Sequence, residues 1–156
     1  MLQVRPRIDR NALGRGERQA AFATFREAPA NTMQNRFEPN PAARPRERTI
    51  RAAVRAALAE DVGTGDVTTL ATIPAGRRAR GQVIAREPLV VAGLAFAEAT
   101  FRAMPGVIVR GCGFLDSQRA RAGETLMTVT GPAGSLLTAE RVALNFLQRL
   151  SGVATL

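Results

Sequence analysis

Apolar residues recur with a helical period in two stretches, one in the middle of the chain and one at its end. From Ile50 to Leu58 they follow the i, i+3, i+4, i+7 spacing, which predicts an amphipathic helix with Thr49 as its N-cap. From Leu136 to Leu150 almost the whole helical circumference is apolar. The exceptions form one polar stripe of Arg141, Asn145, Gln148 and Arg149. A helix with so little polar surface is expected to be buried on most of its sides.

Between these two stretches, short apolar runs separated by turn residues predict strands and one further helix. We expect strands at 80–86, 88–92, 107–110 and 124–130 and a helix at 94–104. Ser135 follows a Gly-Pro turn and is expected to cap the last helix. The order α-β-β-α-β-β-α is typical of the α+β class, with a small antiparallel sheet and helices packed on one face.

The chain divides into three parts by composition. Residues 1–48 hold ten Arg and five Pro with few clustered apolar residues, which predicts a mostly disordered extension. Residues 49–135 are expected to form the α+β domain, and residues 136–156 a helix leading toward a further domain. Because that helix needs more partners than the chain supplies, we expect the chain to be the front part of a longer protein.

Targeting and membrane signals are weak in this sequence. Apolar residues make up 46% of the chain, and no apolar run approaches the roughly 20 residues that span a bilayer. The N-terminal region also lacks the apolar segment of a secretory signal. We therefore expect a cytoplasmic location and no membrane partner.

The composition excludes much catalytic chemistry. All 22 basic residues are Arg, the net charge is +9, and there is no His or Lys. This rules out Ser-His or Cys-His pairs, imidazole metal ligands and Schiff-base lysines within the chain. The single cysteine, Cys112, is interpreted as a small buried residue beside a turn. The positive charge would suit nucleic acid or a polyanionic small substrate. Without Tyr or Trp for base stacking, we interpret it as a preference for Arg over Lys and predict no nucleic-acid partner.

Two carboxylates stand at the end of the first predicted helix. Glu60 and Asp61 lie where the helix macrodipole disfavours negative charge, a departure that often marks a site or an interdomain contact. A turn-rich loop then runs to Asp66. A calcium loop would need Glu at its twelfth position, and a phosphate cradle would need a preceding strand. On spacing alone, both aspartates are interpreted as structural turn residues.

Three motifs occur in a fixed order. The first runs from Ala57 to Thr68 and contains Glu-Asp-Val-Gly-Thr-Gly-Asp-Val-Thr; the second is Val91-Ala-Gly-Leu94. The third begins with Leu137-Thr-Ala-Glu-Arg and continues to Thr155. Together they resemble the quinolinate phosphoribosyltransferase family, also called nicotinate-nucleotide pyrophosphorylase (carboxylating). The resemblance covers the chain from about Thr49 to its last residue.

The resemblance implies an activity and an architecture. Members of the family transfer a phosphoribosyl group from phosphoribosyl pyrophosphate to quinolinate, with Mg²⁺, and release carbon dioxide to form nicotinate mononucleotide for NAD biosynthesis. A small α+β N-terminal domain precedes an incomplete α/β barrel. In the homodimer, the barrel of one subunit faces the N-terminal domain of the other. Arg141 is implied to reach the partner subunit's site and bind a substrate carboxylate, with Glu140 and Asn145 as candidates for support.

The same resemblance implies that the chemistry lies elsewhere. The family's other substrate ligands and its Mg²⁺ site belong to the barrel, so we expect no catalytic residue and no metal site in this chain. A lone guanidinium does not stabilise a departing pyrophosphate, and we expect the chain alone to be inactive. Two alternatives stay open. One is a non-catalytic module that docks on a barrel domain or a full-length enzyme, and the other is a related phosphoribosyltransferase-like protein acting on nicotinate or associated with molybdate transport.

Overall fold

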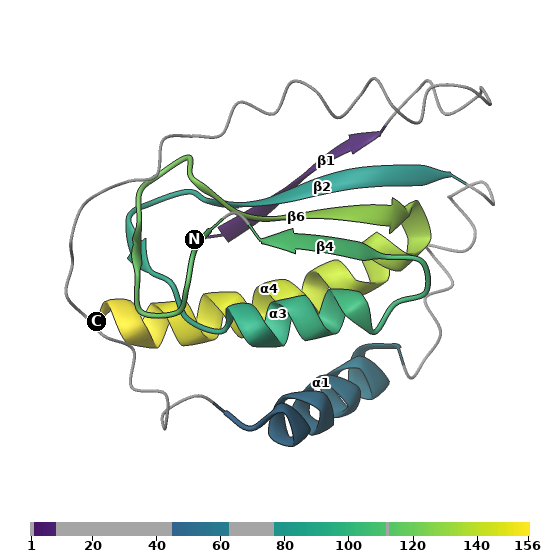
Figure 1. The fold of residues 1–156 in the computed structure, drawn as a ribbon, viewed down its shortest axis with the longest axis horizontal. Coiled ribbons are helices and arrows are strands. Elements are labelled where there is room, and N and C mark those ends of the chain that lie inside the picture. Colours follow the sequence, from purple (N-terminus) through teal and green to yellow (C-terminus); the bar gives the residue numbers. More distant parts are fainter. Residues whose placement is uncertain (1, 9–44, 63–76, 112) are drawn as a thin grey trace.

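The computed structural model of the protein describes residues 2–8, 45–62, 77–111 and 113–156 (Figure 1). Its helices and strands are β1 Leu2–Ile8, α1 Glu47–Val62, β2 Arg78–Ala85, β3 Leu89–Val90, α3 Leu94–Arg102, β4 Ile108–Gly111, β5 Arg119–Ala120, β6 Thr125–Pro132 and α4 Ala133–Thr155. Four strands form one antiparallel sheet in the order β1-β2-β6-β4, while β3 and β5 form a two-stranded sheet.

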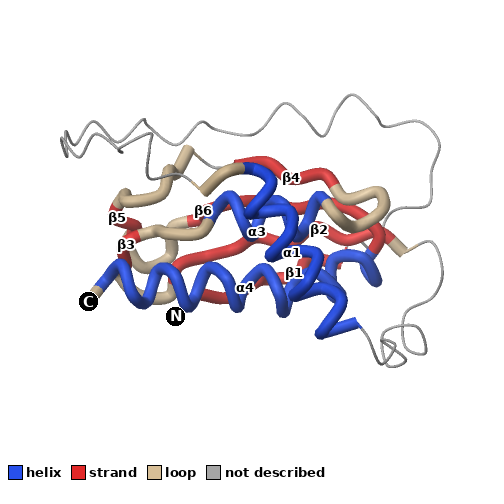
Figure 2. Tube along the Cα trace, turned by 90° about the horizontal axis from the view of Figure 1, so that it is seen from below, coloured by secondary structure: helices blue, strands red, loops and turns tan. Residues whose placement is uncertain are grey.

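The domain is built in layers. Helices α3 and α4 lie side by side on one face of the sheet, and α1 packs on those two helices from outside (Figures 1 and 2). This confirms the predicted α+β class and the antiparallel sheet with helices on one face. Within the described residues there is no α/β barrel, and no helix is long and apolar enough to cross a membrane.

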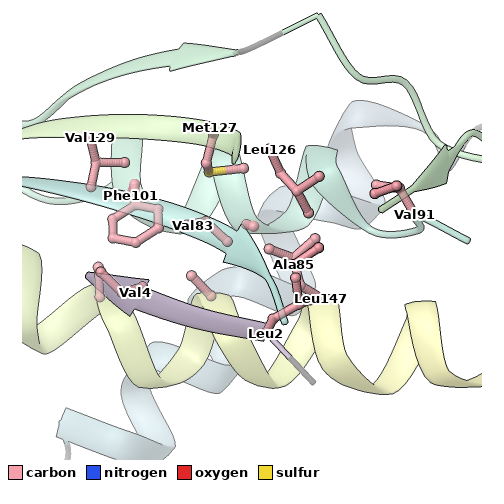
Figure 3. Packing of buried hydrophobic residues seen from close by; sticks show 14 of the residues in the cluster. Leu2, Val4, Val83, Ala85, Val91, Phe101, Leu126, Met127, Val129 and Leu147 are labelled. Carbon is pink, nitrogen blue, oxygen red and sulfur yellow. The ribbon is translucent and has the colours of Figure 1, made fainter. Parts of the chain in front are cut away.

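The core lies between the sheet and the two inner helices. Alternate residues of β2 face inward, so Val83 and Ala85 are fully buried while Gln82 and Ile84 stay partly exposed. Phe101 of α3 and Leu147 of α4 meet them from the helical side (Figure 3). The period-2 pattern of the strands and the helical period of α3 and α4 therefore converge on one apolar cluster.

The N-terminal strand corrects one prediction. The mostly disordered extension expected over 1–48 is wrong for Leu2–Ile8, which pair with β2 along their whole length. Leu2 and Val4 are buried, and the Gln148 side-chain amide donates to the Leu2 carbonyl oxygen at 3.1 Å. The burial of these two side chains and the backbone pairing with β2 therefore order a segment whose composition favours disorder. Residues 9–44 lie outside the described residues.

Two predicted helix starts are also wrong. Helix α1 begins at Glu47, two residues before the expected cap Thr49. The Glu47 carboxylate suits the positive end of the helix and forms an ion pair with Arg51 one turn later. Helix α4 begins at Ala133, so Ser135 lies inside its first turn and donates to the Pro105 carbonyl oxygen at 3.2 Å.

The four predicted strands are present with shifted ends, and β5 is an addition. The expected 88–92 strand is reduced to β3, whose partner β5 is equally short. Polar side chains of α4 complete the hydrogen bonding beside β3. Ser151 Oγ accepts from the Ala92 N–H at 3.0 Å and donates to the Ala92 carbonyl at 3.1 Å, and Thr155 Oγ1 accepts from the Val90 N–H at 3.0 Å. Two side chains of the third motif therefore take the place of a neighbouring strand in bonding to this backbone.

Gly93 of the second motif permits a close approach between α3 and α4. Its φ is +91°, a left-handed conformation that favours glycine. A Cβ at this position would lie 2.7 Å from Leu150 Cδ1 and 3.4 Å from the Phe146 carbonyl oxygen. Beside it, the rings of Phe96 and Phe146 stack with their centroids 5.1 Å apart. The left-handed backbone therefore favours glycine at position 93, and a Cβ there would also force the Leu150 side chain to shift.

Gly93→Ala is expected to lower the free energy of unfolding by about 2 kcal/mol, through the left-handed backbone and the clash with α4. Gly152→Ala is the matched control, because Gly152 lies within α4 and no atom would meet its Cβ within 4 Å. That change is expected to raise the free energy of unfolding by about 0.5–1 kcal/mol through helix propensity. Urea unfolding of both variants measures the difference. Equal effects of the two substitutions would contradict the packing described.

Candidate functional site

The position of α1 determines what lies beside the middle of α4. Ile50 and Val54 are buried on the inner side of α1, which packs against α3 and α4. This apolar contact leaves the C-terminal turn of α1 next to the polar stripe of α4. Asp61, in that turn, comes into contact with Arg141, which is 80 positions later in the chain.

Arg141 and Asp61 form an ion pair between the two helices. Arg141 Nη1 donates to Asp61 Oδ1 at 3.2 Å. The Arg141 side chain is 74% exposed, whereas that of Asp61 is only 25% exposed. The carboxylate is therefore the more enclosed partner, and most of the guanidinium faces solvent. An ion pair with one partner this exposed contributes little to stability.

A groove of about 510 Å³ runs between α1 and α4 beside this pair. Its lining comes from Ala57, Glu60 and Asp61 of α1 and from Val142, Asn145, Phe146, Arg149 and Leu150 of α4. Asp61 belongs both to the groove and to the ion pair, so Arg141 adjoins the groove through it. The groove combines carboxylates, an amide and a guanidinium with apolar side chains.

The residues of the predicted polar stripe, together with Glu140, separate into two groups. Asn145 and Arg149 follow Arg141 at i+4 and i+8 and line the groove, so the structure brings them to one side of α4. Gln148, from the same predicted stripe, instead bonds to β1. Glu140 is not among the residues that line the groove. It borders the buried face of α4, one turn from Leu136 and Ala143.

Burial raises the pKa of the Glu140 carboxyl above its ordinary value of 4.5. The cause is desolvation, which disfavours the charged form. Glu140 takes part in none of the ion pairs among the described residues. It therefore gives Arg141 no direct support in this structure.

Asp61 lies in the last turn of α1, at the helix end where its sequence position places it. Its ion pair with Arg141 is a contact that spacing alone does not predict. The signal that could have identified it is the placement of two carboxylates against the helix macrodipole. Asp66 and Cys112 lie outside the described residues. In the part of the chain that is described, no group of three acidic or thiol side chains is placed to hold a metal ion.

The comparisons with known proteins agree with the motifs. Residues 66–151 match the family model described as quinolinate phosphoribosyl transferase, N-terminal domain. The chain belongs to this family. Because the match covers more than half of the chain, it identifies the described fold as the N-terminal domain of quinolinate phosphoribosyltransferases.

Individual relatives support the same assignment. A tobacco quinolinate phosphoribosyltransferase [decarboxylating] is 39% identical over 108 residues, which are 69% of this chain and 31% of the relative. The nicotinate-nucleotide pyrophosphorylase [carboxylating] of Mycobacterium leprae is 42% identical over 65% of this chain and 37% of its own length. A solved nicotinate-nucleotide pyrophosphorylase from Francisella tularensis aligns with a TM-score of 0.66 and 31% identity, over 72% of this chain and 39% of that one.

The chain thus spans about a third of the length of the curated relatives it matches. The names of two plant relatives assign them to organelles: an Arabidopsis enzyme is chloroplastic and a second tobacco enzyme is mitochondrial.

Glu140→Gln is expected to stabilise the chain more at pH 7.5 than at pH 4.0. An acid whose pKa is raised on folding binds protons more tightly in the folded state, so its cost to stability grows as the pH rises through the raised pKa. Removing the carboxyl removes that cost at neutral pH and changes little when the group is protonated. Urea unfolding at both pH values measures the effect. An equal change in stability at the two pH values would contradict desolvation as the cause.

Proposed function

We propose that this chain supplies the N-terminal, substrate-binding and dimerisation domain of an enzyme that transfers phosphoribosyl from phosphoribosyl pyrophosphate to quinolinate. The observation that carries the proposal is Arg141, a largely exposed guanidinium on a long, well-packed helix. Its family motif and its position on the groove side of α4 agree with binding a ligand outside this domain.

The chemistry of the substrate suits this residue. Quinolinate is a planar dicarboxylate, and a guanidinium pairs with a carboxylate through two parallel N–H···O bonds. A helix holds such a fork more rigidly than a loop does. Asn145 lies one turn after Arg141 and lines the groove, so its amide is close to where the substrate carboxylate would bind. In this proposal Arg141 binds and orients the acceptor, and the bond-making step takes place on residues of another domain.

The chain lacks the groups that the transfer itself requires. Phosphoryl and pyrophosphate oxygens are usually stabilised by clustered cations and a metal ion, and this sequence has neither Lys nor His. The described carboxylates do not form a metal site. As the family resemblance implies, the proposal assigns Mg²⁺ to phosphoribosyl pyrophosphate and a barrel domain, and we propose that the chain alone is inactive.

The proposal includes a partner subunit and a location. Arg141 would complete the active site of a second subunit, as the family resemblance implies for a homodimer. A cytoplasmic location is part of the proposal.

A second candidate is docking without catalysis, and one observation supports docking in both candidates. Leu150 and Val153 near the end of α4 are 38% and 74% exposed, which is unusual for large apolar side chains on a well-packed helix. A covering barrel domain would bury them in either case. The two candidates differ only in whether Arg141 contributes to the reaction.

A complementation assay separates the candidates. The Mycobacterium leprae relative is first inactivated by changing the residue that aligns with Arg141 to alanine, and is then mixed with the full 156-residue chain. Quinolinate-dependent pyrophosphate release is expected to return, because each mixed dimer contains one repaired site. The chain alone is expected to release none. Native mass spectrometry of the mixture shows whether mixed dimers form.

The matched variants are Arg141→Ala and Arg55→Ala, which both remove an exposed guanidinium. Arg141→Ala is expected to lower the restored kcat/KM by about a hundredfold, through loss of a charge-assisted bidentate contact. Arg55→Ala, on the outer side of α1, is expected to change it less than about twofold. Mixed dimers without activity would favour docking alone, and a failure to form mixed dimers would contradict both candidates.

A further inference from the structure

We propose that Asp61 is a positioning residue for Arg141: it holds the guanidinium in the orientation in which it meets the substrate carboxylate. This inference rests on the proposed function, because it assumes that Arg141 binds the acceptor. It adds a residue from a different motif, in a different helix, to the binding of that acceptor.

The location of Asp61 is unfavourable within its own helix. Asp61 lies in the last turn of α1, where carbonyl dipoles repel a carboxylate, and Glu60 beside it adds a second negative charge. No basic residue stands in that turn. The cation that offsets this cost is Arg141, which is contributed by another helix. The ion pair with Arg141 therefore explains why a carboxylate is tolerated at the C-terminal end of α1.

The Asp61 and Arg141 side chains differ in conformational freedom. Asp61 has a short side chain that is 25% exposed and a backbone held by the packing of α1. Arg141 has a long side chain that is 74% exposed, so without a partner it would sample many rotamers. The enclosed carboxylate thus acts as the fixed point, and the arginine is the group that it orders.

The contact leaves most of the guanidinium available. Only Nη1 donates to Asp61, whereas an arginine carries five N–H donors in a planar fork. A substrate carboxylate can accept from the remaining N–H groups while Asp61 keeps its bond. The arrangement is carboxylate–guanidinium–carboxylate, in which the first carboxylate orders the cation and the second is the ligand. Ordering before binding reduces the entropy lost when the ligand binds.

A competing role makes the opposite prediction. If Asp61 merely occupied Arg141 in place of the substrate, removing its charge would free the guanidinium and tighten binding. If Asp61 positions Arg141, its removal leaves a mobile cation and weakens binding. The sign of the change in quinolinate KM therefore distinguishes positioning from competition.

The first measurement concerns Arg141 itself and needs no activity. In the ¹⁵N-labelled 156-residue chain, the Arg141 Nε–Hε order parameter is compared between wild type, Asp61→Asn and Glu60→Gln. Asp61→Asn is expected to lower it below about 0.6, the range of flexible groups, while the neighbouring Glu60→Gln leaves it unchanged. Because the pair is exposed, Asp61→Asn is expected to keep the chain folded. An order parameter unchanged in Asp61→Asn would overturn the proposal.

The second measurement uses the mixed dimers with the inactivated relative. Asp61→Asn is expected to raise the quinolinate KM about fivefold and to change kcat by less than about twofold, because the lost ordering affects ground-state binding. Asp61→Glu, which keeps the charge, is expected to recover part of the affinity. A lowered or unchanged KM in Asp61→Asn would overturn the proposal.

The two measurements separate the proposal from the function on which it rests. If Arg141→Ala supports the reaction as well as wild type, the proposed function fails, and so does the link from Asp61 to the substrate. If Arg141→Ala is defective while Asp61→Asn matches wild type in both measurements, the proposed function stands and only the positioning role of Asp61 fails.

Discussion

The burial of α4 is the constraint on which the rest of the domain depends. Its inner side, which includes Leu136, Ala139, Ala143 and Leu147, packs into the core between the sheet and α3. Small residues on this face allow close approach, and the hydroxyl groups near its end bond to the backbone beside β3. Burying the apolar face of α4 fixes the rotation of the helix about its own axis. The same rotation determines which way the polar side of α4 faces.

The candidate site follows from that orientation. Once α4 is fixed, Arg141, Asn145 and Arg149 point toward the layer where α1 lies, and α1 brings Asp61 to meet the first of them. The site is thus assembled by apolar packing on the inner faces of two helices, while its polar groups remain accessible. A domain that spans about a third of its relatives' length can in this way present Arg141, the side chain that we propose binds the ligand.

The sequence predicts the parts of this structure that local periodicity controls. The fold class, the helices around Val54 and Leu147 and the role proposed for Arg141 follow from spacing and motif. The pairing of Asp61 with Arg141 could not be predicted, because it joins helices 80 positions apart and depends on how they pack. Strand β1 is not predicted for a similar reason, because its partner β2 is distant in sequence. Its seven residues are also too few for an alternation of apolar and polar residues to indicate a strand.

The central claim is that α4 is ordered by this chain itself, so that Arg141 is presented on a preformed helix. Hydrogen exchange of the 156-residue chain tests it most directly. The account predicts that the amides of Ala143 and Leu147 exchange only through global unfolding, with the same free energy as the amides of the central strand residue Val83. Rapid exchange along α4 while the sheet stays protected would contradict it, because the helix would then need a further domain to form.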